Sequence, residues 1–297
     1  MKDYIVRCST NDGSVRAFCA TTRNLVNEAQ KMHKLYPVAT AALGRLLTAA
    51  SMMGAMLKSE DDLLTLQITG NGPLGRVLAT SDCHSNVKGY VGNPLVDIPK
   101  NAQGKLDVGG AIGKEGFLTV IRDFGLKEPY IGKTPLVTGE IGDDLTSYFA
   151  VSEQVPSVVG LGVLVDVDLS VKAAGGFILQ VMPDASEEVI CKLEENIKKV
   201  TSVTKMFDDN MTPEEILKVV LDGIDFTVNE TLDTNYYCNC SKERVEKVLV
   251  SVGEEELLDI IEKDKKAQLT CHFCDKVYNF DETDLKNLLK KARGEKN

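Results

Sequence analysis

Residues 234–245 read TNYYCNCSKERV, and residues 271–280 read CHFCDKVYNF. Thirty residues, 241–270, separate two close pairs of thiols: Cys238, Cys240, Cys271 and Cys274. Zinc prefers four sulfur or nitrogen ligands in a tetrahedron, and a Cys-x-x-Cys turn lets two sulfurs approach one ion. The spacing therefore predicts that these four residues bind one zinc ion.

The region around these thiols, residues 233–297, is about 65 residues long, a size at which an apolar core is barely sufficient and a metal commonly helps. We expect it to be a small zinc-binding domain. His272 lies between two ligands, but four cysteines already complete the site, so we interpret it as a bystander. Tyr278 and Phe280 alternate after the second pair and are expected to pack in the core of this domain.

The preceding segment, residues 184–232, has the pattern of short amphipathic helices. Apolar residues with helical spacing occupy positions 189–200, where Asp184 and Glu187 resemble a capping box. Thr212, Pro213 and Glu215 form a second helix start. Short isolated helices are marginal in water, so we expect a helical linker that docks its apolar side on a neighbouring surface.

Residues 1–183 combine helix and strand signals. A helix is expected after Thr22, and a buried helix at Val38–Leu57, whose Arg45 argues against a membrane span. The remaining runs are β-rich and follow one another without a helix between each pair, which predicts a largely antiparallel α+β domain. These runs are 64–68, 76–80, 87–91, 117–122, 158–167 and 177–182.

Composition limits the function classes. The chain has 297 residues, 43% of them apolar, and a net charge of −10, which argues against a general binder of nucleic acid or anionic membranes. Eight cysteines are too few for a disulfide scaffold, and no signal-like run occurs near the start, so we expect a reducing, cytoplasmic setting. The scattered thiols are expected to be buried and inert: Cys8, Cys19, Cys83 and Cys191.

Several apparent motifs do not indicate an enzyme. GNGPLG at 70–75 matches a dinucleotide pattern but is followed by a strand-like run, so a hairpin turn is expected. No P-loop for ATP occurs, and Cys83 and His84 are neighbours whose side chains point apart. Glu153 lies beside apolar runs and, if buried, needs a basic partner such as Arg45 or Arg76.

The residues alone leave three interpretations of the four clustered thiols: a structural zinc site, a redox switch, or a nucleic-acid-binding zinc ribbon. Zinc ligation contributes on the order of 10 kcal/mol to folding of small domains. The easiest disulfides are the local ones, Cys238–Cys240 and Cys271–Cys274, and neither spans the thirty-residue gap. Oxidation would therefore unfold this domain, release the linker and expose apolar surface.

The chain closely resembles the redox-regulated heat-shock chaperones of the 33 kDa chaperonin family. The resemblance covers essentially the full length: the two thiol pairs with their following SKER and Tyr-x-Phe, and the stretches YFAVSEQVPS (148–157), AAGGFILQ (173–180), TAALGRLLTA (40–49) and TPEEIL (212–217).

This resemblance implies an ATP-independent holdase, inactive while reduced with one zinc per chain, activated by oxidation, and homodimeric when active. Its partners would be unfolded or oxidatively damaged client proteins, with no specific nucleic acid and no membrane. The four clustered thiols match both the zinc ligands and the switch thiols of the family.

One competing class is a regulatory zinc-ribbon protein that binds RNA or a protein partner through a constant fold. Residues 233–297 carry 12 basic and 14 acidic side chains, without the basic stripe that phosphate binding needs. The charge balance therefore favours the chaperone.

Overall fold

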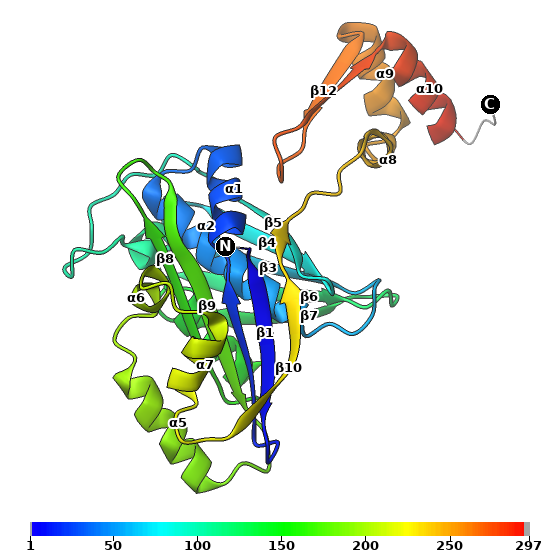
Figure 1. The fold of residues 1–297 in the computed structure, drawn as a ribbon. Coiled ribbons are helices and arrows are strands. Elements are labelled where there is room, and N and C mark those ends of the chain that lie inside the picture. Colours follow the sequence, from blue (N-terminus) through cyan, green and yellow to red (C-terminus); the bar gives the residue numbers. More distant parts are fainter. Residues whose placement is uncertain (1, 294–297) are drawn as a thin grey trace. The chain divides into compact units, whose positions relative to one another are not determined.

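Two largely antiparallel sheets form the framework of the chain up to Tyr237 in the computed structural model, which describes residues 2–293 (Figure 1). The predicted α+β class is confirmed. The five-stranded sheet runs in the order β10 (Phe226–Asp233), β1 (Tyr4–Thr10), β2 (Val15–Thr21), β9 (Val171–Val181) and β8 (Ser157–Val165). The six-stranded sheet runs in the order β11 (Asn235–Tyr236), β5 (Asn86–Val91), β4 (Arg76–Asp82), β3 (Leu63–Gly70), β6 (Gly116–Asp123) and β7 (Tyr130–Pro135).

The long helix α2 (Pro37–Gly54) packs against strands of both sheets. Pro37 occupies its first turn, where a missing N–H costs nothing, and nearly all of its residues are buried. This is the predicted buried helix, and no helix among residues 2–293 combines the length and apolar character needed to cross a bilayer. The other helices that precede β8 are α1 (Arg23–His33), α3 (Val108–Ile112) and α4 (Gly142–Val151).

The central strands of the five-stranded sheet, β2 and β9, are buried on both faces. On β2, Phe18 and Ala20 face the core around α2, whereas Ala17 and Cys19 face a second core. Because both faces are covered, β2 lacks the alternation of apolar and polar residues that identifies a half-buried strand. For this reason β1 and β2 were not predicted from the sequence.

Helices α6 (Val203–Asp208) and α7 (Pro213–Val220) cover the outer face of this sheet, and α5 (Glu187–Lys199) packs against α7. Their apolar side chains, including Leu193, Phe207 and Leu217, pack on what we call the linker-covered face. That face consists of Val6, Cys8, Val15, Ala17, Cys19, Ala173, Phe177 and Leu179. The expected docking of the amphipathic segment is therefore present.

Helix starts in this segment follow the predicted capping chemistry at α7 but not at α5. The Thr212 hydroxyl accepts a hydrogen bond from Glu215 N–H at 3.3 Å, and the Glu215 carboxylate accepts one from Thr212 N–H at 2.8 Å. At α5 the cap is Ser186, which accepts from Val189 N–H, rather than the predicted pair Asp184 and Glu187. Ser186 lies one residue before the helix, where a hydroxyl reaches the unpaired amides of the first turn.

The segment 184–232 is not wholly helical, because it contains most of strand β10. This strand pairs with β1 along seven register positions, yet six of its eight residues are exposed. Polar residues such as Asn229 and Glu230 interrupt the alternation of apolar residues that identifies a strand in a sequence, so β10 was not predicted. The turn GNGPLG joins β3 to β4 in an antiparallel hairpin, as predicted.

A second compact unit begins at Cys238. It contains α8 (Lys242–Ser251), α9 (Glu254–Lys263), the hairpin of β12 (Lys266–Thr270) and β13 (Val277–Asp281), and α10 (Glu282–Ala292). Its core is small, with eight buried apolar residues among those that the structure describes: Leu249, Leu257, Ile261, Tyr278, Phe280, Leu285, Leu288 and Leu289. The predicted packing of Tyr278 and Phe280 is confirmed.

Candidate metal centre

The first thiol pair lies in an extended stretch between β11 and α8. Cys238 follows β11 after one residue, and Cys240 directly precedes Ser241. The Ser241 hydroxyl accepts a hydrogen bond from Arg244 N–H at 3.3 Å and so caps α8. The cap fixes where the helix begins, which leaves both thiols in the chain just before it.

The second thiol pair lies in the turn between β12 and β13. Cys271 closes this turn by donating its N–H to Lys276 O at 3.0 Å. Its own carbonyl accepts from Cys274 N–H at 3.3 Å and from Asp275 N–H at 2.8 Å. Asp275 has φ +55°, a left-handed conformation that aspartate tolerates and that lets the chain reverse. The turn thus presents two sulfurs on the same side.

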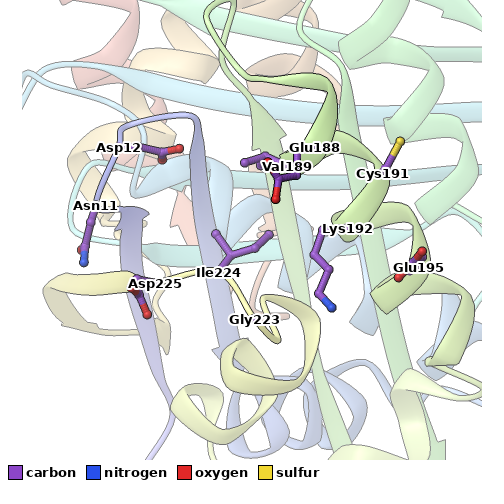
Figure 2. A pocket seen from close by; sticks show the side chains of 10 residues that line it. All are labelled: Asn11, Asp12, Glu188, Val189, Cys191, Lys192, Glu195, Gly223, Ile224 and Asp225. Carbon is purple, nitrogen blue, oxygen red and sulfur yellow. The ribbon is translucent and has the colours of Figure 1, made fainter.

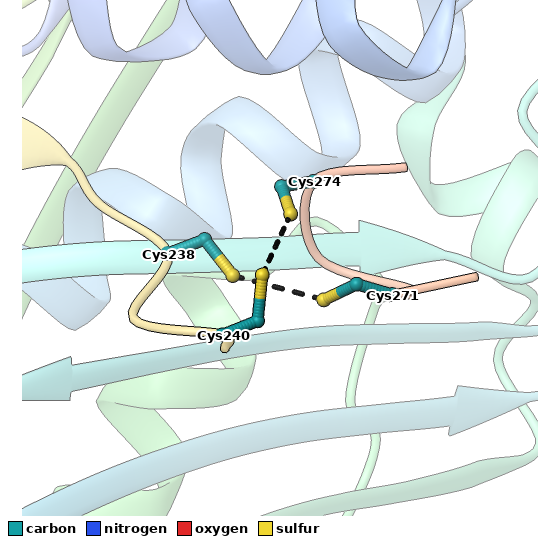
Figure 3. A group of neighbouring side chains, drawn as sticks. All are labelled: Cys238, Cys240, Cys271 and Cys274. Carbon is teal, nitrogen blue, oxygen red and sulfur yellow. Dashed lines mark hydrogen bonds between the residues drawn. The ribbon is translucent and has the colours of Figure 1, made fainter. Parts of the chain in front are cut away.

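The two pairs meet within the second unit (Figure 3). All four sulfurs lie within 4.8 Å of one another, and Sγ–Sγ distances between the pairs are 3.7 Å for Cys238 and Cys271 and 3.3 Å for Cys240 and Cys274. Four half-buried thiols at this spacing could bind a metal ion, and an all-sulfur set suits zinc. His272 is in the same turn, but no atom of it belongs to the cluster.

Tyr278 adds a contact that was not assigned from the sequence. Its hydroxyl donates a hydrogen bond to Cys240 Sγ at 3.0 Å, while its ring packs in the small core. Burial acts to raise the pKa of the Cys240 thiol, but hydrogen bonds from Tyr278 and the three neighbouring thiols outweigh it and lower this pKa to about 7. Burial raises the pKa of both Cys238 and Cys274. In the metal-free cluster, Cys240 is therefore the first of these three to become a thiolate.

The position of Tyr278 explains why its second role was missed. Alternation with Phe280 indicated a core residue, and that part was correct. The hydroxyl reaches the sulfur only because the β12–β13 hairpin and the stretch before α8 come together, and that is a long-range contact between residues 278 and 240. The available signal was a tyrosine, rather than a phenylalanine, four residues after Cys274.

The scattered thiols lie apart from the cluster and differ among themselves. Cys8 and Cys19 are buried on the linker-covered face, as expected, and burial raises the pKa of Cys8 to about 12. Cys83 is half-buried and Cys191 is exposed, so the expectation of burial was wrong for these two. Cys191 lies on the outer side of α5, away from its apolar stripe.

Glu153 is shielded from solvent and has a basic partner, but not one of those predicted. Its carboxylate contacts the Arg122 guanidinium at 2.5 Å, and both side chains are less than one-fifth exposed. Arg45, on α2, pairs with Glu140 instead. The choice of arginine depended on the β6 register, which the sequence does not reveal.

Comparisons with known proteins agree with this arrangement. The family model described as Hsp33 protein matches residues 3–281. A 33 kDa chaperonin of Clostridioides difficile is 53% identical over 98% of this chain and 99% of its own length. One of Ruminiclostridium cellulolyticum is 52% identical over the same shares. The crystal structure of the 33 kDa chaperonin of Thermotoga maritima, 39% identical, superimposes with a TM-score of 0.90 and covers 99% of this chain and 100% of that one.

Proposed function

The chain belongs to the Hsp33 protein family, and from this membership we propose that its four clustered thiols control when it binds unfolded proteins. The protein is a redox-regulated chaperone of the 33 kDa chaperonin type and not an enzyme. The observation that carries the proposal is the convergence of four sulfurs from two segments thirty residues apart.

In the reduced state, the proposed ligands of one zinc ion per chain are Cys238, Cys240, Cys271 and Cys274. Bound zinc would hold all four sulfurs as thiolates and supply folding free energy to the small second unit. The residues fit this role, since all donors are sulfur and mutually within 4.8 Å. Eight buried apolar side chains provide little core of their own among the described residues.

Oxidation is proposed to form the local disulfides Cys238–Cys240 and Cys271–Cys274. A thiol reacts with hydrogen peroxide to give a sulfenic acid and water, and the neighbouring thiol then displaces a second water to form the disulfide. Each bond closes a loop of only a few residues and leaves the two segments untied. A pairing across the gap, such as Cys238–Cys271, would tie them as a metal does.

Unfolding of the second unit is proposed to free the linker that precedes it in the chain. Helices α5, α6 and α7 depend on docking, because helices this short are marginal in water. Their release would uncover the linker-covered face, an apolar surface suited to unfolded chains. The proposed organisation therefore has three parts: residues 1–183 offering the surface, 184–232 masking it, and 233–297 sensing oxidants.

Its clients are proposed to be unfolding or oxidatively damaged proteins, bound without ATP by a homodimer of the active form. A cytoplasmic setting fits, since four thiols that serve as a reversible sensor need a reducing compartment at rest. Membership of the Hsp33 protein family does not support the alternative function, a zinc-ribbon regulator that binds RNA.

The test is light scattering of a client protein during heat unfolding, with reduced, zinc-loaded protein compared with peroxide-treated protein. The proposal expects suppression of aggregation only after oxidation. Cys271→Ser should abolish the reversible switch, while Cys191→Ser, on an exposed thiol outside the cluster, should leave it intact. Equal suppression by reduced and oxidised protein would overturn the proposal.

A further inference from the structure

One short segment, residues 226–236, forms the outermost strand of both large sheets (Figure 1). Its first part, β10, lies at the edge of the five-stranded sheet beside β1, and its last part, β11, lies at the edge of the six-stranded sheet beside β5. Cys238 follows after a single residue. The strand that closes the two sheet edges is thus directly attached to the thiol cluster.

The pairing of β10 with β1 is made mainly by the main chain, and only Phe226 and Leu232, near its two ends, pack against the cores. Register pairs run from Tyr4 opposite Asp233 to Thr10 opposite Phe226, with one irregularity beside Cys8. Six of the eight β10 side chains are exposed, and the Arg7–Glu230 ion pair is about half exposed, so it contributes little. The β1 edge therefore holds a polar strand with few buried side-chain anchors.

The hydrogen bonds at the ends of β1 show which of its residues face β10. Thr234 N–H donates to Asp3 O, and Asn11 N–H donates to Asp225 O. Backbone groups of successive residues in a strand point to opposite neighbours. Ile5, Arg7 and Ser9 therefore face β10, while the residues between them face β2: Tyr4, Val6 and Cys8.

The end of β10 nearest the helical linker adjoins an open hollow, although Phe226 there packs against the second core. This hollow, of about 660 Å³, lies between α5 and the turn that leads into β10. Figure 2 shows the side chains that line it. The rim of this hollow is negatively charged, because one lysine, Lys192, faces four acidic residues: Asp12, Glu188, Glu195 and Asp225. A strand with exposed side chains and an open end has little local stability beyond its backbone hydrogen bonds.

We infer that the β1 edge, once β10 has withdrawn, binds an extended segment of unfolded client polypeptide as an added strand. The inference rests on the proposed function, because withdrawal follows loss of the zinc-bound unit. An uncovered edge presents a row of unpaired N–H and C=O groups that any extended chain can complete. β10 shows what this edge accepts, namely a polar strand recognised through its backbone. Such recognition is independent of sequence, and it adds to the apolar attraction of the linker-covered face.

Hydrogen exchange of the full-length protein, measured residue by residue, tests the inference. In the reduced protein the amides of Ile5, Arg7 and Ser9 should be protected. After peroxide activation they should exchange at least about tenfold faster, while Val6 and Cys8, which face β2, stay protected as an internal control. Addition of an unfolded, reduced and carboxymethylated client should restore protection at the first three.

Two proline variants provide a second test in the reduced, zinc-loaded protein. Glu230→Pro removes an N–H that the register directs at Arg7, whereas Thr231→Pro removes one that the alternation directs away from β1. We expect Glu230→Pro to raise exchange at Ile5, Arg7 and Ser9 and to increase client binding several-fold. Thr231→Pro should match the parent protein in both measurements.

The outcomes separate this inference from the proposed function. The inference is overturned if activated protein suppresses aggregation while the amides of Ile5, Arg7 and Ser9 stay protected. It is also overturned if these amides lose protection on activation and do not regain it when client is bound. In both cases the chaperone function stands. Protection that returns with rising protein concentration in the absence of client would also overturn it, by identifying a second copy as the occupant. Absence of suppression altogether would contradict the proposed function itself.

Discussion

The residue that most affects the reactivity of the thiol cluster, beyond the cysteines, is Tyr278. Its hydroxyl is 3.0 Å from Cys240 Sγ and helps lower the pKa of that thiol to about 7. Tyr278→Phe should raise this pKa by roughly one to two units, because a hydrogen bond to a charged group contributes about 1.5–3 kcal/mol. The measurement is the pH dependence of alkylation of the zinc-free protein, with Tyr237→Phe as the control. An unchanged profile in Tyr278→Phe would contradict the role assigned to this hydroxyl.

Asp3 gives a second prediction at this scale. Asp3 directly precedes β1 and is buried against the first turn of α1. Its carboxylate accepts hydrogen bonds from Leu25 N–H and from the Asn24 side chain. Burial raises its pKa to about 6, above the ordinary value of 3.8, and the hydrogen bonds only partly offset this. A carboxyl with a raised pKa in the folded state favours folding most when protonated, so its contribution falls as pH rises from about 4 through 6.

The stability of Asp3→Asn relative to the parent should therefore increase between pH 4 and pH 8. The expected change is on the order of 2 kcal/mol in the free energy of unfolding, measured by urea denaturation at each pH. A difference between variant and parent that does not vary with pH would show that the carboxyl is not destabilised by burial.

At the scale of elements, the stability of the linker helices sets how readily the linker leaves the sheet. The Thr212 cap begins α7, whose Ile216, Leu217 and Val220 are buried. Thr212→Ala should cost about 1 kcal/mol and lower the amount of oxidant needed for half-maximal aggregation suppression. Thr212→Ser keeps the capping oxygen and should behave like the parent protein. If both variants respond to oxidant as the parent does, α7 does not limit activation.

Gly162 on β8 offers a more selective way to release the linker. A Cβ at this position would lie 2.7 Å from the backbone nitrogen of Thr204 and 2.8 Å from its Cα, both on α6. Gly162→Ala should displace α6 at a cost of roughly 1–3 kcal/mol, as overpacking does elsewhere. We expect faster hydrogen exchange in α6 and partial activity without oxidant.

The matched control for this variant is Gly44→Ala on α2. Its Cβ would meet Val26 Cγ1 at 2.5 Å, in the core around α2 and away from the residues that pack against the linker helices. This variant should lower the stability of the first unit without selective exchange in α6. Equal activation by the two variants would mean that general destabilisation, rather than linker release, turns the chaperone on.

Sequence patterns predicted the elements that carry a clear local signal, such as a cap, an amphipathic repeat or a long apolar run. They missed the elements that carry none of these signals. The capped, amphipathic α7 and the uniformly apolar α2 were both predicted from local signals. β2 was missed because both of its faces are buried, and β10 because most of its side chains are exposed. Register and long-range contacts, such as Arg122 with Glu153, depend on sheet assembly and leave no local signature.

At the scale of the whole molecule, one sensor is joined to two kinds of covered surface. The linker helices cover an apolar face, and residues 226–236 lie at one edge of each large sheet. Both coverings lie in the chain just before Cys238, so loss of the thiol cluster would free them together. The four cysteines could be identified from spacing alone, whereas the surfaces that we propose they control became apparent only in the fold.

The central claim is that oxidation replaces metal ligation by local disulfides. The most direct test is to treat the reduced protein with peroxide, measure zinc released against thiols lost, and map the disulfides in the activated chain. We predict one zinc released for four thiols consumed, with bonds Cys238–Cys240 and Cys271–Cys274. Retained zinc in active protein, or a bond between the pairs such as Cys238–Cys271, would contradict this claim.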